Sequence, residues 1–363
     1  MMTDENYMRE ALRIAKNSIG RTSPNPMVGA IIVKENRIIA EGWHRQVGTE
    51  HAEIHALKMA GELAKGATMY VTLEPCSHFG KTPPCANAIV DAGIKKVFAA
   101  MSDPNPKVSG NGFKILRDSG IDVEVGLLED EARWLNEIFL KWVTTKLPFV
   151  TIKTAMTFDG KIATSTGQSK WITSESSRQR VHEMRDIHDA VMVGIGTVLN
   201  DNPILTARIY GGKNPIRIIV DSNARTPLSS NVVTNHQAKT IIAVTKNAPQ
   251  GRIEALKNHG VEIIFAGDDS QVDLNILTNE LASREITSIF VEGGGTLNFS
   301  LLENDLVDKM YAFIAPKIIG GRESITSVEG IGFKNISDAI TLKNISTEMI
   351  ENDILISGYI ERT

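Results

Sequence analysis

The sequence predicts two α/β domains, on three observations. β-rich runs alternate with segments of helical apolar spacing along the chain, a pattern typical of sheets covered by helices on both faces. A chain of 363 residues has the length of two domains of ordinary size. The alternation breaks at Lys146-Leu147-Pro148, where a helix must end before the proline. We therefore expect one domain over residues 1–146 and a second over 147–363.

The first half is predicted to open with a helix and a hairpin. Residues 8–19 have an amphipathic pattern that ends at Gly20, and the β-rich runs 28–33 and 37–43 flank the turn Lys34-Glu35-Asn36. The remaining expected elements are a helix over 51–64, a strand over 69–73, a helix that opens at Thr82-Pro83-Pro84 with Thr82 as cap and Pro83 in first position, strands over 96–101 and 123–128, and one long helix over 129–145.

The second half continues the same alternation. Its expected elements are a strand over 149–155, a helix over 174–187, strands over 190–194, 216–221, 240–245, 261–266, 286–292 and 310–315, and an antiparallel pair over 341–345 and 354–360.

Composition and charge exclude several classes of protein. Hydrophobic residues make up 42% of the chain and charged residues 23%, as in soluble globular proteins. The net charge of -4 argues against a binder of nucleic acid or of a membrane surface, since both need a basic field. No apolar run approaches the roughly 20 residues of a membrane span, and the mixed charges near the N-terminus do not resemble a secretory signal. We expect a cytoplasmic protein.

The two cysteines, Cys76 and Cys85, lie near other candidate metal ligands. His51-Ala52-Glu53 opens a predicted helix, Cys76 follows a predicted strand, and Cys85 lies in the first turn of the next helix. The alternative is a pair of ordinary buried cysteines, and a lone His-x-Glu is usually a solvated helix start. The combination in this order at strand–helix junctions favours a metal site over both alternatives.

One imidazole and two thiolates would leave the fourth position of a zinc ion open for water. Zinc lowers the pKa of such water toward about 7, and a carboxylate beside it that is not a ligand can carry the proton to a leaving amine. His-x-Glu followed by Pro-Cys and a later Cys is the pattern of zinc deaminases that act on nucleobases. Nucleic-acid and cytidine deaminases usually have Cys-x-x-Cys, whereas eight residues separate the cysteines here.

The first half resembles the deaminase half of the bifunctional deaminase–reductases of riboflavin biosynthesis. The matching segments are Thr22-Ser23-Pro24-Asn25-Pro26-Met27-Val28-Gly29, Gly42-Trp43-His44, His51-Ala52-Glu53, Glu74-Pro75-Cys76-Ser77-His78, Lys81-Thr82-Pro83-Pro84-Cys85 and Asp103-Pro104-Asn105-Pro106. The long insertion between the cysteines is a feature of this family. The resemblance implies a cytidine-deaminase-like α/β/α sandwich in which His51, Cys76 and Cys85 bind zinc and Glu53 moves the proton. It also implies substrate contacts at Asn25, His44, Lys81, Asp103 and Asn105.

Two glycine-containing segments of the second half follow predicted strands. Gly194-Ile195-Gly196-Thr197-Val198-Leu199 has Leu199 where a dinucleotide fingerprint has its third glycine, so a regular Rossmann turn is not expected. Glu292-Gly293-Gly294-Gly295-Thr296 opens a helix, and glycines there let backbone N–H groups approach a pyrophosphate. The alternative for this second segment is a loop or a helix-capping device.

The second half resembles the dihydrofolate-reductase-like domains of the same pathway. The resemblance lies in residues 153–163, in Ser169-Lys170-Trp171-Ile172-Thr173, in Gly196-Thr197-Val198, in residues 201–208 and in the run from Glu292. The family usually has Ser-Leu-Asp-Gly where this chain has Thr157-Phe158-Asp159-Gly160. The implied substrate contacts are Ser169, Arg185, Leu205, Arg208 and Glu292, with the two arginines as phosphate clamps. The implied NADPH contacts are Ala155, Trp171, Thr197, Asp201, Ser222, Gly294, Gly295, Thr296, Leu297, Asn298, Phe299 and Ser300.

The choice between NADPH and NADH rests on the end of the strand over 216–221. Asp221 could accept a hydrogen bond from a ribose hydroxyl, which would favour NADH. Ser222 and Arg225 could instead hold a 2′-phosphate, and the resemblance favours NADPH.

The resemblance covers the whole chain and implies one bifunctional enzyme. Its expected substrate is 2,5-diamino-6-ribosylamino-4(3H)-pyrimidinone 5′-phosphate, which is deaminated and then reduced along the sugar to a ribityl chain. We expect a homodimer or higher homo-oligomer without nucleic-acid or membrane partners. The rival hypotheses are a nucleic-acid-editing deaminase with an appended nucleotide-binding domain, which the charge and the 6% aromatic content disfavour, and a non-catalytic zinc protein, which would need a fourth ligand.

Overall fold

The structure, a computed structural model, describes residues 2–77, 84–105 and 109–361. The chain forms two compact units, Met1–Lys146 and Leu147–Thr363, which are described separately. No helix in these described ranges combines the length and the hydrophobicity needed to cross a bilayer.

The first unit is a five-stranded sheet in the order β2-β1-β3-β4-β5. β1 pairs antiparallel with β2 and β3, and β3, β4 and β5 run parallel. The strands are β1 (Gly29–Lys34), β2 (Arg37–Trp43), β3 (Thr68–Val71), β4 (Lys96–Ala99) and β5 (Asp122–Val125). The helices are α1 (Asp4–Ala15), α2 (Ala52–Ala60), α3 (Cys85–Asp91), α4 (Asn111–Asp118), α5 (Glu129–Leu135) and α6 (Glu137–Thr145), with 3-10 turns η1 (Lys16–Ser18) and η2 (Gly61–Ala64).

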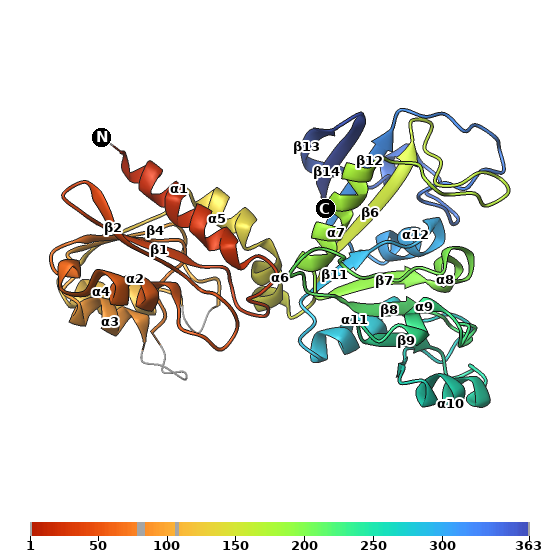
Figure 1. Cartoon of the computed structure of the whole chain (residues 1–363), viewed down its shortest axis with the longest axis horizontal. Helices are drawn as coiled ribbons and strands as arrows, with labels where there is room; N and C mark the ends of the chain where they lie inside the picture. Colours follow the sequence, from red (N-terminus) through yellow and green to blue (C-terminus); the bar gives the residue numbers. More distant parts are fainter. Residues whose placement is uncertain (1, 78–83, 106–108, 362–363) are drawn as a thin grey trace. The chain divides into compact units, whose positions relative to one another are not determined.

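Helices cover both faces of this sheet, as the sequence predicts. Figure 1 shows α1 and α5 on one face and α2, α3 and α4 on the other. α2 packs unusually close to β2, because a Cβ atom at Gly42 would lie 2.4 Å from the carbonyl oxygen of Ala52. Only glycine at this position lets the helix that begins beside His51 approach the sheet so closely.

Three expectations for the first unit need correction. The long helix expected over 129–145 is two helices, because the buried Asn136 leaves the helical path and pairs its side chain with the backbone of Met27 at 2.8 and 2.9 Å. α4 was not expected at all. α3 begins at Cys85, after Pro84, while Thr82 and Pro83 lie outside the described residues.

The second unit is a nine-stranded sheet in the order β10-β9-β8-β7-β11-β6-β12-β14-β13. The strands from β10 to β12 are parallel, and β14 and β13 add an antiparallel edge. The strands are β6 (Phe149–Thr157), β7 (Ala190–Gly194), β8 (Ile216–Val220), β9 (Thr240–Val244), β10 (Glu262–Phe265), β11 (Ser288–Val291), β12 (Lys309–Ala315), β13 (Leu342–Ile350) and β14 (Asp353–Ile360). The helices are α7 (Glu175–Ile187), α8 (Ile195–Asp201), α9 (Asn231–Thr234), α10 (Gln250–Asn258), α11 (Leu274–Ser283) and α12 (Gly295–Glu303), with a 3-10 turn η3 (Ile336–Asp338).

All expected strands of this unit are present, and the expected antiparallel pair is confirmed, although β13 runs five residues beyond the predicted end at Ile345. The expected start of α7 is also confirmed, because the Ser174 hydroxyl accepts from the backbone N–H of Ser177 at 3.2 Å. The helices α8 to α11 were not expected.

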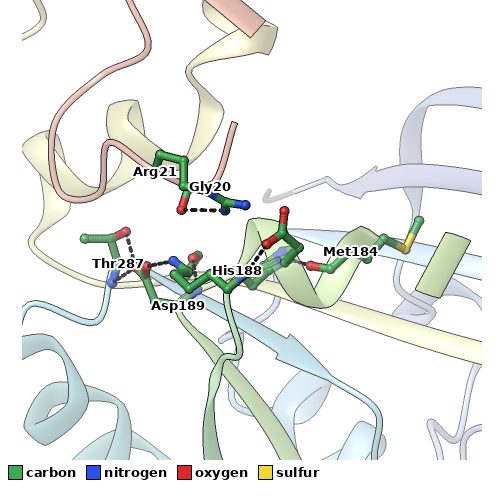
Figure 2. Close-up of polar contacts among 9 residues, drawn as sticks. Gly20, Arg21, Met184, His188, Asp189 and Thr287 are labelled. Carbon is green, nitrogen blue, oxygen red and sulfur yellow. Dashed lines mark hydrogen bonds and ion pairs between the residues drawn. The ribbon is translucent and has the colours of Figure 1, made fainter. Parts of the chain in front are cut away.

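Polar side chains tie α7 and β7 to β11 at the amino ends of these strands (Figure 2). Asp189 accepts from the backbone N–H and the hydroxyl of Thr287 at 3.0 and 2.8 Å. His188 donates through Nδ1 to the Met184 carbonyl at 2.7 Å. At the opposite, carboxyl ends of β7 and β11, the helices α8 and α12 begin next to each other, so both helix N-termini point toward one edge of the sheet.

Candidate functional site

His51, Cys76 and Cys85 come together in the first unit. Their ligand atoms all lie within 4.8 Å of one another, with His51 Nδ1 3.6 Å from Cys76 Sγ and 3.3 Å from Cys85 Sγ. His51 is the residue before α2, Cys76 follows β3, and Cys85 is the first residue of α3. An imidazole and two thiols within this distance form a donor set that zinc prefers. The residues present therefore fit the metal that the sequence predicts.

Backbone contacts close the eight-residue interval between the two cysteines. The N–H of Cys85 donates to Cys76 Sγ at 3.3 Å, and the N–H of Ala86 donates to the Cys76 carbonyl at 3.1 Å. These two contacts hold the first turn of α3 against Cys76.

The charges at this cluster suit a cation. The pKa of Cys76 is lowered to about 4, mainly because the Cys85 thiol donates to its sulfur, and the pKa of Cys85 is raised by the same contact. The hydrogen bond to Cys76 also raises the pKa of His51. Metal ions bind cysteine as the thiolate, so the lowered pKa of Cys76 favours the form that a divalent cation needs.

Glu53 is buried beside this cluster and lies outside the ligand set. Its side chain is 3% exposed, and burial raises its pKa to about 7. A dication held by the neighbouring ligands would lower this pKa. A carboxyl group that changes protonation near neutral pH is suited to moving protons.

Four further residues predicted in this half lie in two pairs. Asn25 Nδ2 lies 3.4 Å from Nε2 of the buried His44, whose ring meets that of His51 edge-on at 5.5 Å. Asp103 accepts from the backbone N–H of Asn105 at 2.8 Å. Lys81, the fifth, lies outside the described residues.

The second unit has a cavity of about 500 Å³ at the carboxyl edge of its sheet. Eleven residues predicted to contact cofactor or substrate line it: Ala155, Ser169, Trp171, Arg185, Thr197, Asp201, Leu205, Arg208, Glu292, Gly294 and Asn298. Ser169 donates to Asp201 at 3.1 Å, which joins a predicted substrate contact to a predicted cofactor contact.

The cavity also fits a nucleotide cofactor. A Cβ atom at Gly294, which lines the cavity, would meet nothing within 4 Å, so this glycine leaves open space beside the start of α12. Exposed backbone N–H groups at helix N-termini bind phosphate groups.

Six predicted cofactor contacts do not line the cavity: Ser222, Gly295, Thr296, Leu297, Phe299 and Ser300. The Ser222 hydroxyl accepts from the backbone N–H of Val272 at 3.1 Å. Leu297 and Phe299 are buried in the core of the unit. Asp221, which could have favoured NADH, is fully buried, and one of its oxygens accepts from the N–H and the hydroxyl of Thr226, both at 2.7 Å.

The two arginines predicted as phosphate clamps have different surroundings, and the phosphate role of each stays a prediction. Arg185 forms a two-pronged ion pair with Glu292 and also donates to the Thr206 carbonyl at 3.0 Å, so three of its guanidinium N–H groups have protein acceptors. Within the described ranges Arg208 has no hydrogen-bond or ion-pair partner, and it lines the same cavity. Among the described residues, no protein acceptor therefore competes with a ligand for the Arg208 guanidinium.

Lys153 and His182 are among the titratable residues of the cavity that sequence reasoning did not assign to the site. Burial lowers the pKa of Lys153, and Lys153 has no hydrogen-bond partner in the part of the chain that the structure describes. Burial, reinforced by Arg185 and Arg208, lowers the pKa of His182 to about 4. The available signal for Lys153 was a charged residue within the otherwise uncharged strand β6.

Comparisons with known proteins match both units. The family of the cytidine and deoxycytidylate deaminase zinc-binding region matches residues 1–101, and the RibD C-terminal domain family matches residues 148–356. The riboflavin biosynthesis protein RibD of Actinobacillus pleuropneumoniae is 47% identical over 98% of this chain and 95% of its own length. That of Aquifex aeolicus is 45% identical over 97% of each chain.

The chain belongs to the RibD family. This family joins a zinc deaminase to a pyrimidine reductase in riboflavin biosynthesis, and the chain carries both halves. A solved RibD from Acinetobacter baumannii has 36% identity and a TM-score of 0.88, with 99% of each chain covered. A deaminase/reductase from Thermotoga maritima has 39% identity and a TM-score of 0.86, with 98% of each chain covered. The predicted fold class, with a cytidine-deaminase-like and a reductase domain, is confirmed.

Proposed function

We propose that the RibD-family chain acts first on 2,5-diamino-6-ribosylamino-4(3H)-pyrimidinone 5′-phosphate and then reduces the deaminated product with NADPH. The final product is 5-amino-6-ribitylamino-uracil 5′-phosphate. The observation that carries the proposal is the presence, in one chain, of the His51–Cys76–Cys85 cluster beside buried Glu53 and of a cavity with the unpaired Arg208. The Thermotoga maritima relative is named as a deaminase and reductase of these phosphoribosylamino-pyrimidines.

In the deaminase half, His51, Cys76 and Cys85 would hold zinc, which supplies an activated water when bound. Glu53 takes the proton from the attacking water and delivers it to the ring amine. A carbon–oxygen bond forms at the ring carbon, the carbon–nitrogen bond breaks, and ammonia leaves. Burial keeps Glu53 away from competing water, so the same carboxyl can accept and donate in turn.

The substrate of this half would be held by Asn25, His44, Lys81, Asp103 and Asn105. The contact of Asn25 with His44, and of the His44 ring with His51, supports a pocket that adjoins the metal ligands.

In the reductase half, we assign the substrate phosphate to Arg208. Leu205 and Ser169 line the same cavity and would contact the substrate, while Arg185 holds Glu292 in place. Ala155, Trp171, Thr197, Asp201, Gly294 and Asn298 would contact NADPH. The NADPH contacts of Ser222, Gly295, Thr296, Leu297, Phe299 and Ser300, which lie outside the cavity, stay predictions. We expect these residues to contact NADPH through their backbone groups.

Hydride chemistry belongs to the cofactor, and the chain supplies orientation and a proton. When hydride reaches the open-chain carbonyl carbon of the sugar, the carbonyl oxygen must gain a proton. Lys153, half-buried in the cavity near Glu292, is suited to donate it because partial burial favours loss of its charge.

One experiment tests both halves. Purified protein is incubated with the diamino-pyrimidinone phosphate, with and without NADPH, and the products are identified by mass. We expect ammonia and the deaminated ribosyl compound without NADPH, and the ribityl compound with it. Release of no ammonia from zinc-loaded protein would contradict the proposed substrate.

The proposed compartment is the cytoplasm, and the proposed assembly is a homodimer or higher homo-oligomer.

A further inference from the structure

The carboxylate of Glu74 joins two segments of the deaminase half. Glu74 is two residues before Cys76 and only 4% exposed. Its Oε2 accepts from the backbone N–H groups of Asp103 and Gly110 at 3.2 and 3.0 Å, and its Oε1 accepts from that of Gly112 at 3.0 Å. One side chain from the metal-binding segment thus binds three backbone groups of the segment that carries Asp103.

These bonds replace a cap that α4 lacks. The residue before α4 is Gly110, in the left-handed region at φ 81°, and it has no side chain to accept from the first helical N–H groups. A carboxylate at a helix N-terminus satisfies those groups and interacts favourably with the helix dipole.

The two segments are also in close backbone contact. A Cβ atom at Gly112 would lie 2.0 Å from the Pro75 carbonyl oxygen, and the N–H of Glu74 donates to the Met101 carbonyl at 3.0 Å. The backbone of Glu74 and Pro75 therefore contacts residues on both sides of Asp103.

We propose that Glu74 is a positioning residue of the deaminase half, which sets the Asp103–Asn105 segment against the substrate while Cys76 holds the metal. This inference rests on the proposed function for the identity of the substrate. Glu74 is outside the metal-ligand group, and its hydrogen bonds go to the backbone of Asp103, Gly110 and Gly112 rather than to Glu53. Its loss should therefore raise KM for deamination far more than it lowers kcat.

The test is Glu74→Gln in the full chain loaded with zinc. The amide keeps the size of the side chain, but its NH2 group faces backbone donors and cannot accept from them. A hydrogen bond to a charged group contributes more than a neutral one to the stability of the arrangement that it holds. We therefore expect KM for ammonia release to rise about tenfold or more. Zinc content and NADPH-dependent reduction by the same preparation should not change. Glu62→Gln, in the exposed 3-10 turn η2, is the matched control.

Amide hydrogen exchange gives a readout that needs no turnover. The amides of Asp103, Gly110 and Gly112 should exchange faster in Glu74→Gln and at the wild-type rate in Glu62→Gln. Unchanged exchange at these amides in Glu74→Gln would overturn the inference. Loss of zinc from Glu74→Gln would also overturn it, and so would an unchanged KM together with a lower thermal stability. If wild-type protein releases no ammonia from the proposed substrate, the proposed function fails, and the exchange rates still decide whether Glu74 holds the segment.

Discussion

Arg185 and Glu292 form a two-pronged ion pair at the wall of the reductase cavity. Nε lies 2.5 Å from Oε1 and Nη2 lies 3.0 Å from Oε2, and both side chains are about nine-tenths buried. Burial alone would raise the pKa of Glu292, but the charge and hydrogen bonds of Arg185 bring it below its usual value. The pair engages the Glu292-facing side of the Arg185 guanidinium, and for that reason our proposal assigns the substrate phosphate to Arg208.

Replacement of the proton-moving carboxylate should separate metal binding from catalysis. Glu53→Gln should keep zinc, because Glu53 is not among the ligands, and should lower ammonia release by about 10²–10⁴-fold, the usual contribution of general acid–base catalysis. Metal analysis and an ammonia assay on the same sample check this, with Glu62→Gln as control. Loss of zinc in Glu53→Gln would show that the carboxylate has a structural role at the metal.

Loss of the free guanidinium should weaken only the reductase. Arg208→Ala should reduce turnover of the phosphorylated intermediate by roughly one to two orders of magnitude, as expected for a charge-assisted phosphate contact. The dissociation constant of NADPH and the rate of deamination should stay unchanged. If Arg208 instead holds the 2′-phosphate of the cofactor, NADPH binding weakens and preference shifts toward NADH. Titration with both cofactors decides this, and Arg225→Ala tests the other candidate for the 2′-phosphate.

The buried ion pair should matter more for stability than an exposed one on the same helix. Arg185→Met leaves the Glu292 carboxylate buried without its partner and should lower the free energy of unfolding by about 3–5 kcal/mol. Arg180 pairs with Glu183 on the surface of α7, with about half of each side chain exposed, so Arg180→Met should cost less than about 1 kcal/mol. Equal losses measured by denaturant unfolding would contradict this interpretation.

The same variant has a defined pH dependence. In the wild type the pKa of Glu292 is lowered, so its contribution to stability is present above the ordinary glutamate pKa of about 4.3 and is lost as the pH falls through the folded value. Without Arg185, burial raises the pKa of Glu292. Protonation of Glu292 as the pH falls then removes the unpaired buried charge that destabilises the folded state. The stability deficit of Arg185→Met should therefore shrink between about pH 7 and about pH 5. A deficit that grows over this interval would contradict the assignment.

The first unit should work without the second. A fragment of residues 1–146 retains the metal ligands, Glu53 and the contacts between Asn136 and Met27 that hold α5 and α6 to the sheet. We expect it to bind zinc and to release ammonia. A folded fragment that is inactive while the full chain is active would mean that the two halves depend on each other.

The sequence predicted what local patterns determine. Alternating apolar runs gave the strands, Ser174 marked the start of α7, and the order of His51, Cys76 and Cys85 at strand–helix junctions gave the metal cluster. These features depend on the order and periodicity of residues, so no distant partner had to be known.

The features it missed depend on pairs of residues far apart in the chain. Asn136 interrupts a helix because of Met27, 109 positions earlier, and Arg185 pairs with Glu292, 107 positions later. Whether a polar side chain keeps an unused hydrogen-bond donor or acceptor depends on its tertiary partners, which the sequence does not show. For that reason the sequence placed both arginines on the phosphate, whereas the structure leaves only one of them unpaired.

Gly42 has a consequence for how this enzyme tolerates variation. It carries no functional group, yet Ala52, whose carbonyl it faces, lies between His51 and Glu53. Any side chain at position 42 would lift the start of α2 from the sheet and carry a metal ligand and the proton-moving carboxylate away from the cysteines. In a saturation scan selected for ammonia release, residue 42 should therefore tolerate as few replacements as the ligands themselves, and directed-evolution libraries gain by leaving it fixed.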